Sequence, residues 1–280
     1  MSIITRFAPS PTGRLHLGHA AAALFAHRCA REDGGRFLLR LEDIDPVRCR
    51  PDYAAAILDD LAWLGVSWDG PVRTQSEHLP EYRAVLDTLD RRGLLYPCFC
   101  TRGDIARAAS APHGPEGVLY PGTCRRLSAL DRERRRAAGD LHALRLDTMR
   151  ALAMTGPLSY SEAGVRRPCD PARFGDVVLA RRDAPASYHL CVAHDDAAQG
   201  VTLVTRGEDL RDGTAIHRLL QSLMGWPEPA YRHHALLTDA AGRRLAKRDG
   251  AASLAALRAT GTNPAQLRAQ LAASFVHSAP

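Results

Sequence analysis

The sequence lacks the features that mark membrane and exported proteins. No apolar run approaches the roughly 18 residues that a membrane-spanning helix needs, so we exclude an integral membrane protein. The first residues, MSIITRFAPSPTG, lack the basic start, the apolar middle and the small-residue cleavage site of a signal peptide. The seven cysteines are an odd number, and without an export signal they are not expected to form a disulfide framework. We therefore expect a cytoplasmic protein with no membrane partner.

Lysine is almost absent, although the chain is basic. The formal net charge is +6, and of the 37 lysine and arginine residues only Lys247 is a lysine. A GC-rich genome replaces lysine by arginine wherever a positive charge is all that is needed, but not where a compact, flexible ammonium is required. The single lysine therefore marks a candidate functional position, with chance as the alternative. The positive net charge weakly favours a polyanionic partner.

The opening of the chain is typical of an α/β nucleotide-binding unit. Residues 2–8 predict a short buried strand, residues 17–31 an alanine-rich helix, and residues 36–43 a second strand. Strand, loop, helix and strand in this order form a βαβ unit, in which the loop lies at the carboxyl end of the first strand. Doubly wound sheets bind nucleotides at that end.

The loop of this unit carries the eleven residues from Pro9 to His19, which include a His-x-Gly-His motif. Glycine beside a helix start lets a phosphate chain approach the backbone, and the helix N-terminus favours negative charge. His16 and His19 lie three residues apart on the first turn and can donate hydrogen bonds to phosphate oxygens. A polar turn with two surface histidines is the alternative, which the eleven-residue context disfavours.

Four stretches resemble one known family, in the family's own order. RFAPSPTGRLHLGHA (6–20) is similar to the opening signature of class I glutamyl-tRNA synthetases, whose HIGH motif binds ATP, and LLRLEDIDPVR (38–48) resembles the segment that follows. SYHLCVAHDDAAQGVTLVTRGEDL (187–210) resembles the family's amino-acid pocket, and GRRLAKRDGA (242–251) its KMSKS loop. The resemblance implies an α/β fold: a Rossmann-type class I aminoacyl-tRNA synthetase catalytic domain that activates glutamate.

The resemblance also implies roles for individual residues. His16, His19 and Lys247 are the implied catalytic residues, supported by Mg²⁺ bound with ATP. The implied ATP-binding residues are Pro9, Ser10, Gly13, His16, Gly18, His19 and Lys247. The implied glutamate-binding residues are Arg6, Ala8, Ser10, Glu42, Tyr188 and Arg206, of which the arginines can hold a carboxylate bidentately. The KMSKS-like loop departs from the family at Arg244 and Ala246, from which we expect weaker loop closure.

Three cysteines cluster in the chain. Cys98, Cys100 and Cys124, with one further donor, can form a tetrahedral structural zinc site, although a single-residue gap between the first two is unusual and ordinary reduced thiols are the alternative. Short paralogues within the resembling family carry a Cys-x-Cys, Tyr, Cys site, which implies Tyr120 as the fourth ligand, with His113 as competitor. The remaining cysteines are expected to be buried small hydrophobes: Cys29, Cys49, Cys169 and Cys191.

The resemblance gives the expected domains and activity. The expected parts are the first catalytic half (1–92), an inserted zinc-containing mixed α/β subdomain (93–171), the second half with the KMSKS-like loop (172–248) and a short helical tail (249–280). Because the sequence ends soon after that loop, we expect no anticodon-binding domain. This is the form of the short paralogues, which activate L-glutamate with ATP without tRNA. They transfer it to the queuosine base in the anticodon of tRNA(Asp), and a monomer is expected.

Three other interpretations of the sequence stay open at this point. The chain could be a truncated glutamyl-tRNA synthetase that charges tRNA(Glu). It could be another nucleotidyltransferase of the HIGH superfamily, although such an enzyme would not need Arg6, Glu42, Tyr188 and Arg206 together. It could also be a non-catalytic relative that binds zinc and RNA, which the retained Lys247 disfavours.

Overall fold

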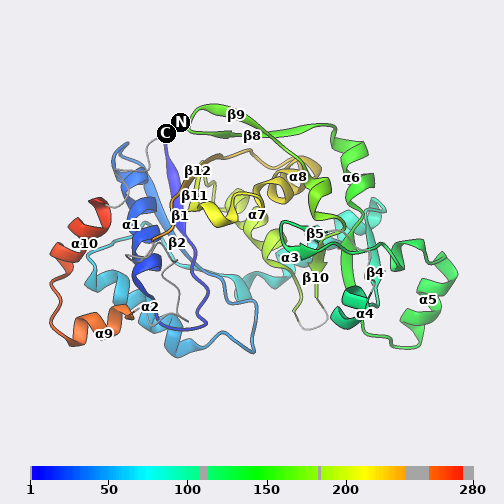
Figure 1. Cartoon of the computed structure of the whole chain (residues 1–280), viewed down its shortest axis with the longest axis horizontal. Helices are drawn as coiled ribbons and strands as arrows, with labels where there is room; N and C mark the ends of the chain where they lie inside the picture. Colours follow the sequence, from blue (N-terminus) through cyan, green and yellow to red (C-terminus); the bar gives the residue numbers. More distant parts are fainter. Residues whose placement is uncertain (1, 108–112, 182–183, 238–251, 274–280) are drawn as a thin grey trace.

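A parallel sheet starts at the N-terminus of the chain, whose computed structural model describes residues 2–107, 113–181, 184–237 and 252–273 (Figure 1). Strand β1 (Ile4–Phe7) pairs in parallel with β2 (Arg36–Leu41), and β2 pairs with the short β3 (Arg73–Thr74). Helix α1 (Leu17–Arg31) connects the first two strands. Five of its six alanines are buried, because small side chains let the helix approach the sheet closely. The predicted βαβ opening is confirmed.

A second sheet, beside the first, comes from residues far along the chain. β11 (Leu203–Gly207) and β12 (Ala230–His234) are parallel and are connected by α8 (Thr214–Met224). The backbone N–H of Thr202 donates to the carbonyl of Ile4 at 3.0 Å, which fixes β11 beside β1. Helix α7 (Tyr188–Ala198) precedes β11 and was not anticipated as a helix. The carboxyl ends of four strands thus meet at one edge.

An antiparallel hairpin extends this sheet. β8 (Leu158–Glu162) and β9 (Val165–Cys169) are joined by Ala163 and Gly164, which both have positive φ, and β8 pairs in parallel with β12. Two consecutive residues with positive φ match the right-handed twist of a tight hairpin. The sequence analysis did not predict this hairpin.

A separate antiparallel sheet carries the region of the cysteines. Its order is β10-β7-β4, with β4 at Leu95–Cys98, β7 at Ala143–Leu146 and β10 at Val178–Ala180. Strand β10, which follows residue 171, pairs with β7 in this sheet, whereas the β8–β9 hairpin, which precedes residue 171, pairs with β12 in the other sheet. The predicted domain boundary at 171 remains a prediction. The other elements here are α4 (Arg102–Arg107), β5 (His113–Gly114), β6 (Gly117–Val118), α5 (Ala129–Ala137) and α6 (Thr148–Thr155).

The remaining helices complete two cores. α2 (Pro51–Trp63), α9 (Leu254–Ala259) and α10 (Pro264–Ala273) contribute to the core around β1, β2 and α1, whereas α3 (Leu79–Arg91) packs in the core that holds α7 and α8. Figure 1 places α9 and α10 at the end of the molecule opposite α4 and α5. Throughout the described ranges, no helix has the length and apolarity to cross a bilayer. Cys29 and Cys191 are buried as predicted, but Cys49 and Cys169 are partly exposed, so that prediction was wrong for two cysteines.

Candidate active site

A cavity of about 540 Å³ opens at the carboxyl ends of β1, β2, β11 and β12. It is the edge at which an α/β sheet places its ligands. The predicted site residues that line it are Arg6, Ala8, Pro9, Ser10, His16, Gly18, His19, Glu42, Tyr188 and Arg206. Gly13 does not line the cavity, and Lys247, Arg244 and Ala246 lie outside the described residues. Thr205, Asp209, His234 and Leu236 also line it and were not predicted as site residues.

The N-terminus of α1 forms one wall of the cavity. His16 is the N-cap residue, and its Nδ1 accepts from the backbone N–H of Gly18 at 3.1 Å. The backbone N–H of His16 donates in turn to Nδ1 of His19 at 3.3 Å, and the two ring centroids lie 3.8 Å apart. Because both Nδ1 atoms accept, a neutral ring carries its proton on Nε2 and can donate from there. The paired rings at a helix N-terminus suit an anion such as phosphate.

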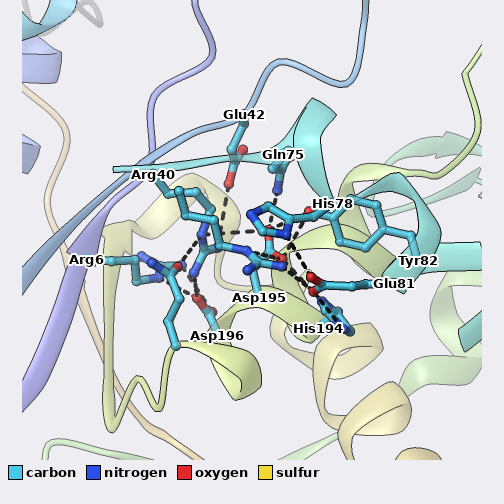
Figure 2. A network of polar contacts seen from close by, with 12 residues as sticks. Arg6, Arg40, Glu42, Gln75, His78, Glu81, Tyr82, His194, Asp195 and Asp196 are labelled. Carbon is cyan, nitrogen blue, oxygen red and sulfur yellow. Dashed lines mark hydrogen bonds and ion pairs between the residues drawn. The ribbon is translucent and has the colours of Figure 1, made fainter. Parts of the chain in front are cut away.

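Arg6, which lines the cavity, shares one buried carboxylate with Arg40. Arg6 donates from Nε to Asp196 at 2.8 Å, and Arg40 donates from Nη2 to the same oxygen at 2.6 Å (Figure 2). Burial opposes the ionisation of Asp196, but Arg6 and Arg40 hold its pKa below the usual value. Arg6 also donates to the carbonyl of Thr205 at 3.1 Å. Arg6 is therefore anchored to a buried counter-charge.

Asp195, the residue before Asp196 in α7, connects this helix to its neighbours. Its carboxylate accepts from Arg73 at 2.9 Å, from Gln75 at 2.8 Å and from the hydroxyl of Tyr82 at 3.0 Å, and it is fully buried. Figure 2 shows Gln75, from the turn after β3, and Tyr82, from α3, pointing toward it, and Arg73 lies on β3 itself. Asp195 does not line the cavity, so it positions α7 rather than contacting a ligand.

Glu42 is the acidic group directly after β2. Its side chain is only 10% exposed and lies 4.0 Å from Nη1 of the fully buried Arg40. Burial raises the pKa of Glu42 to about 7, and the neighbouring guanidinium groups of Arg40 and Arg6 moderate that rise. A carboxylate held in this way gains stability when a further cation, such as a substrate ammonium, enters the cavity.

Arg206 and Tyr188 form the far wall. Arg206 lies one residue before the end of β11, is 6% exposed, and donates from Nη2 to the hydroxyl of Thr214 at 2.6 Å. Tyr188 begins α7, and its ring centroid lies 5.8 Å from that of His217. The cavity is therefore lined by a buried cation, Arg206, and a buried anion, Glu42. The two histidines line it from the N-terminus of α1.

The cysteine cluster lies away from this cavity. The Sγ atoms of Cys98, Cys100 and Cys124 all lie within 4.8 Å of one another, and those of Cys100 and Cys124 are 3.6 Å apart. Tetrahedral zinc with Zn–S bonds of about 2.3 Å places sulfurs about 3.8 Å apart, so the triad fits that ion. The hydroxyl of Tyr120 lies 3.7 Å from Sγ of Cys100, close enough to complete the set. The side chain of the competing His113 lies outside the described residues.

Comparison with known proteins adds independent findings. Residues 2–279 match the family described as tRNA synthetases class I (E and Q), catalytic domain. A glutamyl-Q tRNA(Asp) synthetase of Rhodobacter capsulatus is 53% identical over 278 residues, covering 95% of this chain and 98% of the relative. One from Nocardia farcinica is 47% identical over 270 residues, covering 96% and 84%. The crystal structure of a glutamate tRNA ligase from Elizabethkingia meningosepticum in complex with its amino acid matches with a TM-score of 0.75 and 27% identity. The match covers 89% of this chain but only 53% of that one.

Proposed function

The chain belongs to the class I tRNA synthetases for glutamate and glutamine, and we propose that it activates L-glutamate with ATP and transfers it to queuosine in the anticodon of tRNA(Asp). Activation does not require the tRNA. The relatives that match over most of their own length are glutamyl-Q tRNA(Asp) synthetases, which supports the choice of acceptor. The observation that carries the proposal is the cavity, where Glu42, Arg206 and the two histidines surround one space.

The first step joins glutamate to AMP. The α-carboxylate attacks the α-phosphorus of ATP, a new P–O bond forms, and the bond to pyrophosphate breaks. Negative charge gathers on phosphate oxygens in this in-line displacement, so catalysis depends on positioning and on positive donors. His16 and His19 donate to the phosphates from the first turn of α1, and Lys247 supplies its ammonium to the leaving group. Mg²⁺ bound with ATP neutralises phosphate charge.

Glutamate is held by its two charged ends. Glu42 accepts the ammonium, and Arg206 holds the side-chain carboxylate, with Tyr188 as an additional donor. Arg6 supports this end, but its Nε already donates to Asp196. The second step transfers the glutamyl group to queuosine, in an anticodon loop whose unpaired bases are accessible to a protein. Cys98, Cys100, Cys124 and Tyr120 would hold a structural zinc ion, which would stabilise the insert. The functional unit is a monomer.

ATP–pyrophosphate exchange without any RNA tests the activation step. Wild-type protein should exchange pyrophosphate into ATP only when L-glutamate is present. A Lys247→Ala variant should lower the rate at least about tenfold, because one charge-assisted contact to the leaving group is lost. The control is Arg83→Gln, since the side chain of Arg83 is 77% exposed and lies outside the cavity. Exchange that is absent in the wild type would identify a non-catalytic relative.

A further inference from the structure

The guanidinium of Arg206 is held differently from that of Arg6. We propose that His217 and His233 are positioning residues that hold Arg206 through unprotonated ring nitrogens, so that its charge is kept for the substrate. On this proposal, which rests on the proposed function, the two histidines set the preference for glutamate over glutamine. The evidence is a set of hydrogen bonds whose direction is fixed by the chemistry of arginine.

The first set of bonds runs through α8 and α7. Nη1 of Arg206 lies 3.1 Å from Nδ1 of His217, and Nε2 of His217 lies 3.2 Å from Nδ1 of His189. Nε2 of His189 lies 3.0 Å from the carboxylate of Glu116. Arginine has no acceptor, so Nδ1 of His217 must accept, and its proton sits on Nε2. Nδ1 of His189 must then accept as well, and its Nε2–H donates to Glu116.

The second set of bonds runs through β12. Nε of Arg206 donates to Nε2 of His233 at 3.3 Å, which requires the proton of that ring on Nδ1. Nδ1 of His233 donates to Glu162 at 2.7 Å. The other oxygen of Glu162 forms an ion pair with Arg167 at 2.8 Å and accepts a hydrogen bond from Arg211 at 2.5 Å. The charge of Glu162 is therefore balanced by these two arginines.

Both histidines that face Arg206 are thus neutral by geometry. Burial, with the nearby Arg206, lowers the pKa of His217 well below its usual value and that of His233 to about 4, in agreement with that assignment. Nη2 of Arg206 donates to the hydroxyl of Thr214, a third neutral acceptor. Among the described residues, no carboxylate lies within ion-pair distance of Arg206, whereas Arg6 shares Asp196 with Arg40.

These contacts leave the part of the guanidinium that a carboxylate needs. Of its five N–H groups, three donate to His217, His233 and Thr214, and the contacts of the described residues leave one N–H on each terminal nitrogen. One N–H from each terminal nitrogen is what bidentate binding of a carboxylate requires. Glutamine has the same length as glutamate, but its amide NH₂ is a hydrogen-bond donor and would face a guanidinium N–H, which is also a donor. The amide also carries no charge to pair with the guanidinium. A buried cation without a protein counter-charge therefore discriminates against it.

A matched pair of variants isolates charge from shape. His217→Asn keeps a neutral acceptor for Arg206. His217→Asp places a side chain of nearly the same shape as asparagine at this position but adds a negative charge. Equilibrium dialysis with labelled glutamate and labelled glutamine measures both dissociation constants. We expect the Asp variant to weaken glutamate binding about tenfold or more relative to the Asn variant, with glutamine binding little changed. Thr214→Asn and Thr214→Asp form a second pair, and aspartate suits that position because it begins α8.

The outcomes separate the inference from the proposed function. Equal glutamate-to-glutamine selectivity in folded Asn and Asp variants at either position would overturn the inference. So would a wild-type protein that binds glutamine as tightly as glutamate. Selective glutamate binding without pyrophosphate exchange would support the inference while rejecting the proposed activity. A thermal melt of each variant identifies any that does not fold, and the pair at the other position then decides the test.

Discussion

Lowering the pH from 8 to 6 should weaken glutamate binding, because Glu42 must be ionised to accept the substrate ammonium. Burial raises the pKa of Glu42 to about 7. With that value, Glu42 is about 90% ionised at pH 8 and about 10% ionised at pH 6, so the dissociation constant should rise about tenfold. The ammonium of glutamate stays protonated over this range, so the change arises in the protein.

The same pKa predicts an opposite effect on the stability of the ligand-free protein. A carboxyl whose folded-state pKa exceeds its unfolded value binds its proton more tightly when folded. The free energy of unfolding should therefore fall as the pH rises from about 4.5 to about 7, by about 3 kcal/mol, and then level off. Glutamate binding should restore part of that loss, since its ammonium offsets the buried charge.

Glu42→Gln is the matched variant, because it keeps the shape and removes the titration. Binding of labelled glutamate, measured by calorimetry at pH 6, 7 and 8, should be weak and independent of pH in this variant. Urea unfolding at pH 8 should show the variant to be more stable than the wild type. A wild-type dissociation constant that stays flat between pH 6 and 8, or a variant that keeps the slope, would refute this account of Glu42.

Two further predictions concern buried charge and metal. Asp196→Asn should destabilise the protein by about 3–5 kcal/mol in denaturant unfolding, because Arg6 and Arg40 lose their shared counter-charge. Cys124→Ala should remove bound zinc, measured by elemental analysis of the purified protein, and should increase limited proteolysis within residues 93–171. Stability of Asp196→Asn within about 1 kcal/mol of the wild type would contradict the first prediction. Equal zinc content in Cys124→Ala and in a Cys29→Ala control would contradict the second.

The sequence predicted the parts of the site that depend on local pattern. The strand, the glycine-containing loop and the helix start around His16 and His19 are contiguous, so their arrangement follows from the βαβ unit itself. The Arg6–Asp196 pair could not be predicted in this way, because 190 residues separate its members and neither residue type signals the other. An arginine at position 40, between the apolar residues 37–39 and Leu41 of β2, was the available signal that a buried counter-charge was needed.

The histidines around Arg206 were missed for a related reason. His217 lies among apolar residues at helical spacing, and a lone histidine there is ordinarily a core residue. Its role emerges only when the fold places α8 beside β11, so that Nδ1 lies 3.1 Å from the guanidinium of Arg206. The β8–β9 hairpin supplies Glu162 to the same network, and the sequence analysis did not anticipate its strands. Polar networks that join distant elements depend on the tertiary fold, which local periodicity does not describe.

Transfer of radiolabelled glutamate to purified RNA, with ATP and Mg²⁺, tests the central claim most directly. The acceptors are tRNA(Asp) that carries queuosine, the same tRNA without queuosine, and tRNA(Glu). We predict label on queuosine-bearing tRNA(Asp) alone. Label on tRNA(Glu), or label on tRNA(Asp) that does not depend on queuosine, would contradict the proposed acceptor. The absence of label from all three would contradict transfer itself.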